Sequence, residues 1–159
     1  MPIIALLLSA LLVAADQLIK LLAVEYLQPV GQITVIPGIF NLLYLENRGA
    51  AFGILQNQKW FFIAVTGVIT LAIIFALFRY NNHEFFSYAA SILIIGGGIG
   101  NLIDRVRLSY VIDYLSFSFF PPIFNFADCC VTVGTLLLVI HFLFFAERES
   151  SSNKVIRRR

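Results

Sequence analysis

Three aspartates that could do chemistry stand in the second half of the chain. Asp104, Asp113 and Asp128 are three of only nine acidic residues in a sequence that is 60% hydrophobic. A carboxylate at the centre of a membrane-spanning helix costs about 2.5–3.5 kcal/mol, so carboxylates near apolar spans need partners or a function. Asp113 and Asp128 flank Pro121-Pro122, where we expect a turn that brings the two carboxylates together.

Two carboxyl groups within hydrogen-bonding distance cannot both ionise easily, so one pKa rises and they share a proton. One can then act as a base on water while the other, as an acid, polarises a carbonyl group, as in aspartic proteases. This chemistry requires no metal and no cofactor. From the residues alone, an ion-coupled carrier or channel with intramembrane acids remains equally open. A Ser–Lys pair such as Ser109 with Lys20 also remains open, but no motif supports it.

Three of the charged residues also have simple structural explanations. Asp128 precedes an apolar run, where a carboxylate could cap a helix by accepting hydrogen bonds from free backbone N–H groups. Asp16 and Lys20 are four residues apart, on one helical face and in the favoured acid-before-base order. They could form a neutral pair at the end of a helix or line the site.

The composition indicates a membrane protein. Mean hydropathy is +0.89 and 13% of the 159 residues are charged, whereas an average soluble domain has about 25% charged residues. The net charge of +2 gives no indication of nucleic-acid binding. Cys129 and Cys130 are adjacent and lack metal-ligand spacing, so we expect small buried residues.

We predict a single, mainly α-helical, polytopic membrane domain over residues 1–159, with four transmembrane helices and a small extracytoplasmic cap that contains β-strands. The expected spans cover residues 2–24, 60–78, 85–104 and 128–146. The cap covers 29–58, with strands in Ile33–Ile36 and Ile39–Leu45, and Leu108–Phe126 is expected to be an interfacial loop.

The orientation follows from a basic tail. Residues 147–159 carry most of the positive charge of the second half, which predicts a cytoplasmic C-terminus. Four spans then put the N-terminus in the cytoplasm too, and the cap and the aspartates near the extracytoplasmic face.

The end of the third predicted span is rich in glycine and polar residues. Gly97, Asn101 and Asp104 share one helical face, and Arg105 follows Asn101 by four residues. We expect Arg105 to orient Asp104, Asn101 and the neighbouring backbone through charge-assisted hydrogen bonds.

Five short motifs occur in a fixed order between Asp16 and Asp128. They are Asp16-Gln17-x-x-Lys20, Asn47-x-Gly49-Ala50-Ala51-Phe52, Gly97-Gly98-x-Gly100-Asn101-x-x-Asp104-Arg105, Val111-Ile112-Asp113-Tyr114 and Phe124-Asn125-x-Ala127-Asp128. Together they resemble the lipoprotein signal peptidases of bacteria, the signal peptidase II family. The sequence departs from the family pattern at Tyr114, where phenylalanine is common.

The resemblance implies an intramembrane aspartyl endopeptidase of the bacterial plasma membrane. Such enzymes cleave the signal peptide of a prolipoprotein on the N-terminal side of a cysteine that carries diacylglyceryl. The resemblance makes Asp113 and Asp128 the catalytic acids. The positions that would bind substrate or support the site are Asp16, Lys20, Asn47, Gly49, Asn101, Asp104, Arg105, Asn125 and Ala127. Expected partners are lipid-modified prolipoproteins, membrane lipids and globomycin-type peptide inhibitors; no metal or cofactor is implied, and a monomer is expected.

Overall fold

The computed structural model describes residues 2–49, 55–80 and 84–144, which form four long helices and one small sheet. The helices are α1 (Pro2–Leu22), α2 (Lys59–Arg79), α3 (Phe85–Leu108) and α4 (Phe126–Phe144). A short π-helix, η1 (Ala23–Leu27), continues α1. All four are long and apolar enough to cross a membrane, with mean hydropathies between 1.6 and 2.7. The prediction of a mainly helical, four-span membrane protein is confirmed.

The helices differ from the predicted spans at the ends that bear the polar residues. Helix α3 continues past Asp104 to Leu108, and α4 begins at Phe126, two residues before Asp128. Arg105 and Arg107 fit the last turn of α3, because cations interact favourably with a helix C-terminus. The basic tail at 147–159 lies outside the described residues, as does part of the predicted cap, residues 50–54.

The sheet has four antiparallel strands in the order β1-β2-β3-β4. The strands are β1 (Gln32–Ile36), β2 (Phe40–Asn47), β3 (Val111–Phe117) and β4 (Phe120–Phe124). The first two lie where strands were predicted in the cap. The prediction of a loop over Leu108–Phe126 is wrong, because most of that segment forms the β3–β4 hairpin and extends the sheet.

The prediction of a Pro-Pro turn is also wrong. Pro121 and Pro122 lie inside β4, and the chain reverses at Ser118 and Phe119. Strand β4 is an edge strand of the sheet, where prolines are tolerated because their missing N–H groups need not pair with a neighbour. The hairpin, followed at once by α4, brings the two halves of the candidate site together.

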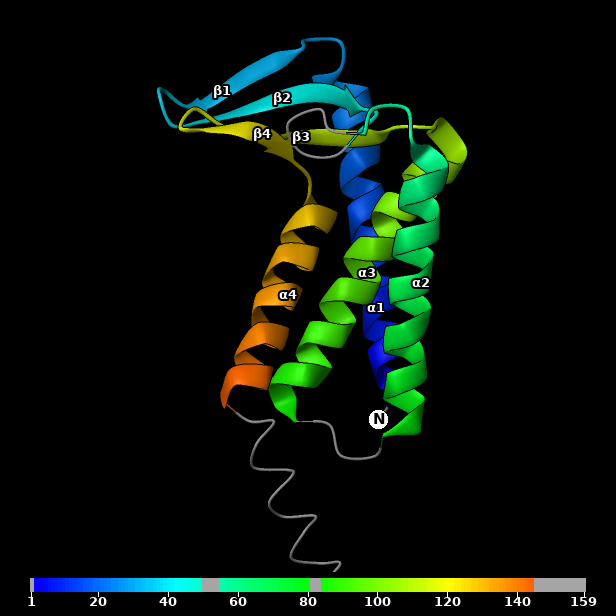
Figure 1. The fold of residues 1–159 in the computed structure, drawn as a ribbon. Helices are drawn as coiled ribbons and strands as arrows, with labels where there is room; N and C mark the ends of the chain where they lie inside the picture. Colours follow the sequence, from blue (N-terminus) through cyan, green and yellow to red (C-terminus); the bar gives the residue numbers. More distant parts are fainter. Residues whose placement is uncertain (1, 50–54, 81–83, 145–159) are drawn as a thin grey trace, which may run out of the picture.

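The sheet lies across one end of the helices and extends sideways beyond α4 (Figure 1). The first and last described residues, Pro2 and Phe144, both lie at the other end. Helix α3 is central and packs against α1, α2 and α4. We refer below to the end with the sheet as the sheet end.

Two glycines of α3 permit this close packing. A Cβ atom added at Gly97 would collide with the backbone carbonyl oxygen of Ala127 in α4, and one at Gly100 would lie 2.5 Å from Oδ2 of Asp16 in α1. Helix α3 can therefore approach both neighbours at the level of the predicted site residues.

Candidate active site

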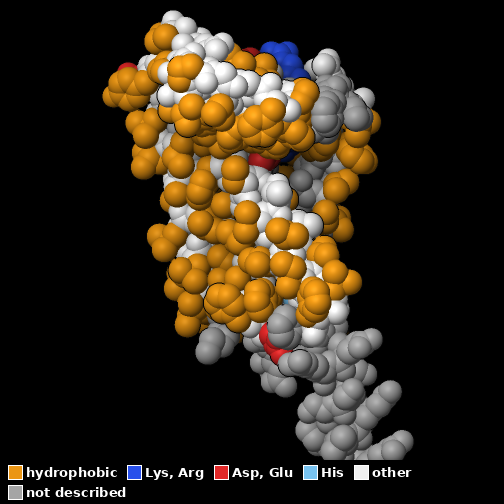
Figure 2. All heavy atoms as spheres, turned by 90° about the vertical axis from the view of Figure 1, so that its left-hand side faces the viewer, with side chains coloured by type: hydrophobic (Ala, Val, Ile, Leu, Met, Phe, Trp, Pro, Cys, Tyr) orange, Lys and Arg blue, Asp and Glu red, His pale blue; other side chains and the backbone are white. Residues whose placement is uncertain are grey.

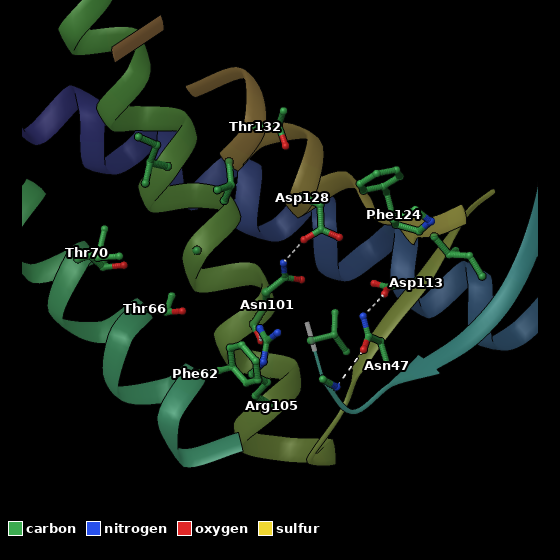
Figure 3. A pocket seen from close by; sticks show the side chains of 18 residues that line it. Asn47, Phe62, Thr66, Thr70, Asn101, Arg105, Asp113, Phe124, Asp128 and Thr132 are labelled. Carbon is green, nitrogen blue, oxygen red and sulfur yellow. Dashed lines mark hydrogen bonds between the residues drawn. The ribbon is translucent and has the colours of Figure 1, made fainter. Parts of the chain in front are cut away.

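Asp113 and Asp128 border one cavity of about 370 Å³ at the sheet end, which is also lined by residues of α2 and α3 (Figure 3). Strand β3 supplies Asp113, and the first turn of α4 supplies Asp128. The Asp113 side chain is 1% exposed, whereas Asp128 is half-buried. The structure therefore brings the two predicted catalytic acids to the same pocket.

Asp113 accepts two hydrogen bonds from side-chain amides. Nδ2 of Asn47 lies 2.8 Å from Oδ2, and Nδ2 of Asn125 lies 2.6 Å from Oδ1. The Asn47 amide is itself oriented by the backbone N–H of Gly49, which donates to its Oδ1 at 2.9 Å. These contacts explain why an Asn-x-Gly sequence at the end of β2 belongs to the site.

Asp128 is held by Asn101 and by the start of its own helix. Nδ2 of Asn101 donates to Oδ1 at 2.7 Å, and the backbone N–H of Asn125 donates to Oδ2 at 3.2 Å. The backbone N–H of Asp128 in turn donates to Oδ1 of Asn125 at 2.8 Å. This reciprocal pattern is a capping box, with Asn125 as the N-cap and Asp128 at the third helical position. Asp128 is therefore part of a helix cap, and its other oxygen is directed to Asn101.

The two carboxyl groups are joined through two amides. Nδ2 of Asn125 donates both to Asp113 and, at 3.1 Å, to Oδ1 of Asn101, whose own Nδ2 donates to Asp128. Asn125 is 0% exposed, and its side-chain nitrogen and oxygen both have hydrogen-bond partners inside the protein. The two amides fix the relative positions of both carboxyl groups.

Burial raises the pKa of Asp113 to about 7, and the nearby charge of Asp128 acts in the same direction. The hydrogen bonds from Asn47 and Asn125 oppose this shift because they stabilise the charged form. Near neutral pH, Asp113 is thus present in both its protonated and its ionised form, as suits a general acid or base.

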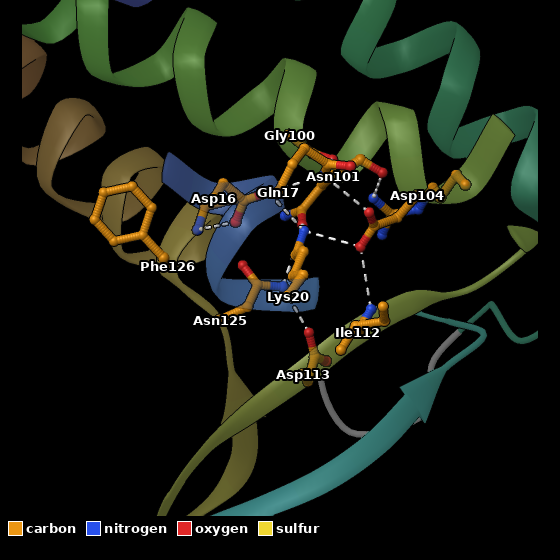
Figure 4. A network of polar contacts seen from close by, with 12 residues as sticks. Asp16, Gln17, Lys20, Gly100, Asn101, Asp104, Ile112, Asp113, Asn125 and Phe126 are labelled. Atoms are coloured by element: carbon orange, nitrogen blue, oxygen red, sulfur yellow. Dashed lines mark hydrogen bonds and ion pairs between the residues drawn. The ribbon is translucent and has the colours of Figure 1, made fainter. Parts of the chain in front are cut away.

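A buried lysine of α1 links this helix to α3 beside the pocket (Figure 4). Nζ of Lys20 lies 2.9 Å from a carboxylate oxygen of Asp16, 2.9 Å from one of Asp104 and 2.9 Å from Oδ1 of Asn101. The three donors of the ammonium group thus have three acceptors, and the side chain is 2% exposed. Asp16 and Lys20 form the expected pair, and Lys20 also holds Asn101, which contacts Asp128.

The two acids of this network anchor the neighbouring elements through backbone groups. Oδ1 of Asp16 accepts from the backbone N–H of Ala127 at 3.1 Å, and Oδ2 of Asp104 accepts from that of Ile112 at 3.2 Å. Ala127 precedes Asp128, and Ile112 precedes Asp113. Each network acid therefore fixes the residue next to one of the candidate catalytic acids.

Arg105 has only part of the predicted role, because it contacts the neighbouring backbone but not the Asp104 carboxylate. The carboxylate of Asp104 is paired with Lys20, and among the described residues Arg105 forms no ion pair with it. Its guanidinium instead lies 4.7 Å from the ring centroid of Phe62, and Nη1 is 3.5 Å from the backbone oxygen of Asn101. Arg105 still lines the cavity together with both aspartates (Figure 3).

Two residues in the network were not predicted as site residues. Nε2 of Gln17 donates to Asp104 at 3.0 Å and to Asp16 and the Gly100 carbonyl at 3.2 Å. The hydroxyl of Tyr114 accepts from the backbone N–H of Phe126 at 3.0 Å, at the start of α4. Gln17 could have been found from its place in the first motif, whereas the contact of Tyr114 depends on the tertiary structure.

The carrier alternative finds no support in this arrangement. Within the described helices, Asp16, Asp104 and Asp128 gather at the sheet end, so they mark one site and not a path across the membrane. The described residues also include no cluster of three or more His, Cys, Asp or Glu side chains that could hold a metal ion.

The fold and the site define a multi-pass membrane protein with a carboxylate-bearing pocket at one end of its helices. The model of the family described as signal peptidase (SPase) II matches residues 8–144. The chain is 45% identical over 140 residues to a lipoprotein signal peptidase of Caldanaerobacter subterraneus subsp. tengcongensis, covering 88% of this chain and 96% of that protein. A lipoprotein signal peptidase of Clostridioides difficile is 46% identical over 142 residues, covering 87% of this chain and 94% of that protein.

Two solved structures of bacterial membrane enzymes, both determined by the in meso method, share the fold. The first has a TM-score of 0.79 and 32% sequence identity, and the match covers 94% of this chain and 90% of the other. The second has a TM-score of 0.78 and 31% sequence identity, and the match covers 89% of this chain and 94% of the other. The chain belongs to the signal peptidase II family. It is therefore an aspartic-type protease of the membrane, as its motifs led us to expect.

Proposed function

We propose that the chain cleaves the signal peptide of diacylglyceryl-modified prolipoproteins on the N-terminal side of the lipidated cysteine, with Asp113 and Asp128 as the catalytic pair. Membership of the signal peptidase II family supports prolipoprotein processing. The observation that carries the assignment of residues is the shared pocket, in which two amides position both carboxyl groups.

In the proposed mechanism, Asp113 is the acid and Asp128 is the base. The raised pKa of Asp113 supports a protonated carboxyl group at neutral pH. Asp128 accepts hydrogen bonds from Asn101 and the backbone of Asn125, and both bonds stabilise a carboxylate.

The Asp128 carboxylate takes a proton from a water molecule, whose oxygen attacks the scissile carbonyl carbon while Asp113 gives its proton to the carbonyl oxygen. The tetrahedral intermediate then collapses. The C–N bond breaks and Asp128 passes its proton to the leaving nitrogen. Asp113 takes back its proton from the hydroxyl group that was the carbonyl oxygen, which restores the carbonyl. Both acids return to their starting states, and the chemistry uses no covalent enzyme intermediate.

The walls of the cavity suit a substrate that is itself a membrane helix. Below the aspartates the cavity is bordered by Ile69 and Thr70 of α2, Ile94 of α3 and Val131 of α4. Ile69, Ile94 and Val131 also border a second, largely apolar cavity of about 630 Å³ between the same three helices. We propose that the hydrophobic part of the signal peptide enters along this route from the lipid.

We further propose that the sheet end faces the extracytoplasmic side and that both termini lie in the cytoplasm of a bacterial plasma membrane. The even number of described spans puts Pro2 and Phe144 at the same end, and the sequence of the tail is basic. Inhibition by globomycin-type peptides is proposed from the resemblance alone, and a monomer is proposed because nothing in the sequence demands a second copy.

The test is cleavage of a diacylglyceryl-modified prolipoprotein by the purified full chain, followed by a mobility shift on a gel. Asp113→Asn and Asp128→Asn should remain folded and produce no cleaved product. Glu84→Gln is the matched control, since it removes a carboxylate at the opposite end of the helices and should cleave normally. Normal cleavage by Asp128→Asn, or failure of the wild type to cleave, would overturn the proposal.

A further inference from the structure

The part of the sheet that extends beyond α4 ends in two turns made almost entirely of apolar residues. We call the segments Ile36–Phe40 and Phe117–Phe120 the aromatic tip. Neither segment contains a charged residue. Ile36, Ile39 and Phe119 are 47%, 50% and 76% exposed, although a turn at the edge of a sheet is normally polar.

Three rings of the aromatic tip, those of Phe40, Phe117 and Phe119, contact one another in a row. The ring centroids of Phe40 and Phe117 are 5.0 Å apart, and those of Phe117 and Phe119 are 5.7 Å apart. Phe120 stacks on Phe124 at 5.5 Å. These contacts give the two turns a common apolar surface, and they hold the exposed Phe119 ring on the same side as Phe117.

The register shows which way this surface faces. Side chains alternate along a strand, so Asp113, Leu115 and Phe117 lie on the same face of β3. Phe40 pairs with Phe117 and therefore shares that face. Asp113 points into the cavity above the helices, so the aromatic tip faces the same way, toward the membrane beside α4.

The surface continues the lipid-facing side of α4. Val133 and Leu136 of that helix are 48% and 58% exposed, as expected for residues that contact lipid chains. Figure 2 shows hydrophobic side chains along the lower border of the sheet, directly above the hydrophobic side of the helices, with an acidic side chain visible in the notch between them. Aromatic side chains are enriched at the depth where the lipid headgroups meet the acyl chains.

We propose that the aromatic tip inserts into the lipid leaflet at the sheet end and anchors the strand that carries Asp113 at a fixed depth. Phe117 and Asp113 are four residues apart on β3, or about 13 Å along the strand. The bilayer then holds the sheet at two places, through the tip on one side and through the helices on the other. This role goes beyond peptide cleavage and does not depend on it.

Trp60 is the only tryptophan of the chain. In a Trp60→Phe background, one tryptophan introduced elsewhere is therefore the only source of tryptophan fluorescence. We would place it at Phe119→Trp and reconstitute the full chain, without substrate, in phosphatidylcholine–phosphatidylglycerol vesicles. Part of the phosphatidylcholine would be brominated on the acyl chains close to the headgroup. The matched control is Thr34→Trp, which is exposed on the same sheet but lies on the opposite face, since Thr34 pairs with Asn41 and Asn41 with Ser116.

The brominated lipid should quench Phe119→Trp at least about twofold more strongly than Thr34→Trp, and acrylamide in the water should quench it less. Ile39→Trp, in the other turn, should behave like Phe119→Trp and guards against a local effect of one substitution. Equal quenching at the tip and at Thr34 would overturn the proposal. So would quenching that appears only when a prolipoprotein is added, or that changes with the protein-to-lipid ratio, because the tip would then contact substrate or a second copy.

Discussion

The side-chain amide of Asn125 donates a hydrogen bond of 2.6 Å to Oδ1 of Asp113, although the two residues come from different elements. The same Asn125 caps the helix that carries Asp128. One buried side chain thus sets the position of both candidate catalytic acids, and it does so with its donor on one and its acceptor on the other.

Replacement of Asn125 should separate its two roles. Asn125→Ser keeps a good N-cap residue but removes the amide donor from two buried acceptors. We therefore expect a loss of about 1–3 kcal/mol of stability and a kcat lower by about 10²-fold, as for other lost site donors. Asn125→Ala should lose the activity and a further 0.5–2 kcal/mol of stability, since alanine caps poorly, roughly as for other N-caps. The measurements are kcat on a diacylated prolipoprotein and thermal unfolding. Full activity of Asn125→Ser would contradict the proposal that the Asn125 amide positions both acids.

The activity should depend on pH through Asp113. If this residue acts as the acid with a pKa of about 7, kcat/KM should fall as the pH rises through that value. The amide of Asn47 stabilises the charged form of Asp113, so Asn47→Ala should raise this pKa and move the alkaline fall to higher pH. A pH profile of kcat/KM for both proteins checks the direction. An unchanged or acid-shifted profile in Asn47→Ala contradicts the assignment.

Asp113 should also make the folded protein less stable at alkaline pH. Its pKa is higher in the folded state, at about 7, than the ordinary 3.8, so the folded form binds the proton more tightly. The stability that Asp113 contributes is therefore full below about pH 4 and is lost as the pH rises from there through about 7. Asp113→Asn has no proton to lose, so its melting temperature should exceed that of the wild type at pH 8 and match it more closely at pH 4. Thermal unfolding of both proteins across this range is the measurement.

Lys20 should be costly to remove because two buried carboxylates depend on it. Lys20→Met leaves Asp16 and Asp104 without their cation, for which a loss of about 3–5 kcal/mol of stability is expected. The variant that also carries Asp16→Asn and Asp104→Asn should recover most of that stability. Unfolding measurements on the single and triple variants test this. If Lys20→Met alone is as stable as the wild type, the network is not what holds these helices together.

The packing of α3 against α4 should tolerate no side chain at Gly97. Gly97→Ala places a methyl group against the backbone oxygen of Ala127, which cannot move without displacing the first turn of α4 and Asp128 with it. We expect a loss of about 1–3 kcal/mol of stability together with lower activity. Gly67→Ala in α2 is the matched control, since nothing lies within 4 Å of its added Cβ, and it should be neutral or slightly stabilising. Equal stability of the two variants would contradict the packing argument.

The sequence by itself determined the four apolar spans, because length and hydropathy are local properties, and a bilayer permits few other structures for such segments. Its motifs also led us to predict residues of the candidate site, namely Asp113, Asp128, Asn47, Asn101 and Asn125, although they did not lead us to Gln17 or Tyr114. The spacing of Asp16 and Lys20 was enough to predict their ion pair.

The tertiary structure alone decided how those residues connect. Pro121 and Pro122 indicated a turn, yet they lie in an edge strand. A proline is tolerated in a strand where its missing N–H group has no partner to bond, and only the position of the neighbouring strands decides where that is. Arg105 follows Asp104 directly in sequence, yet Asp104 pairs with Lys20 from another helix. The partner of a buried charge depends on which elements pack against it. Gly97 and Gly100 allow α3 to approach α4 and α1 closely, and these contacts join residues far apart in the sequence, which no local pattern predicts.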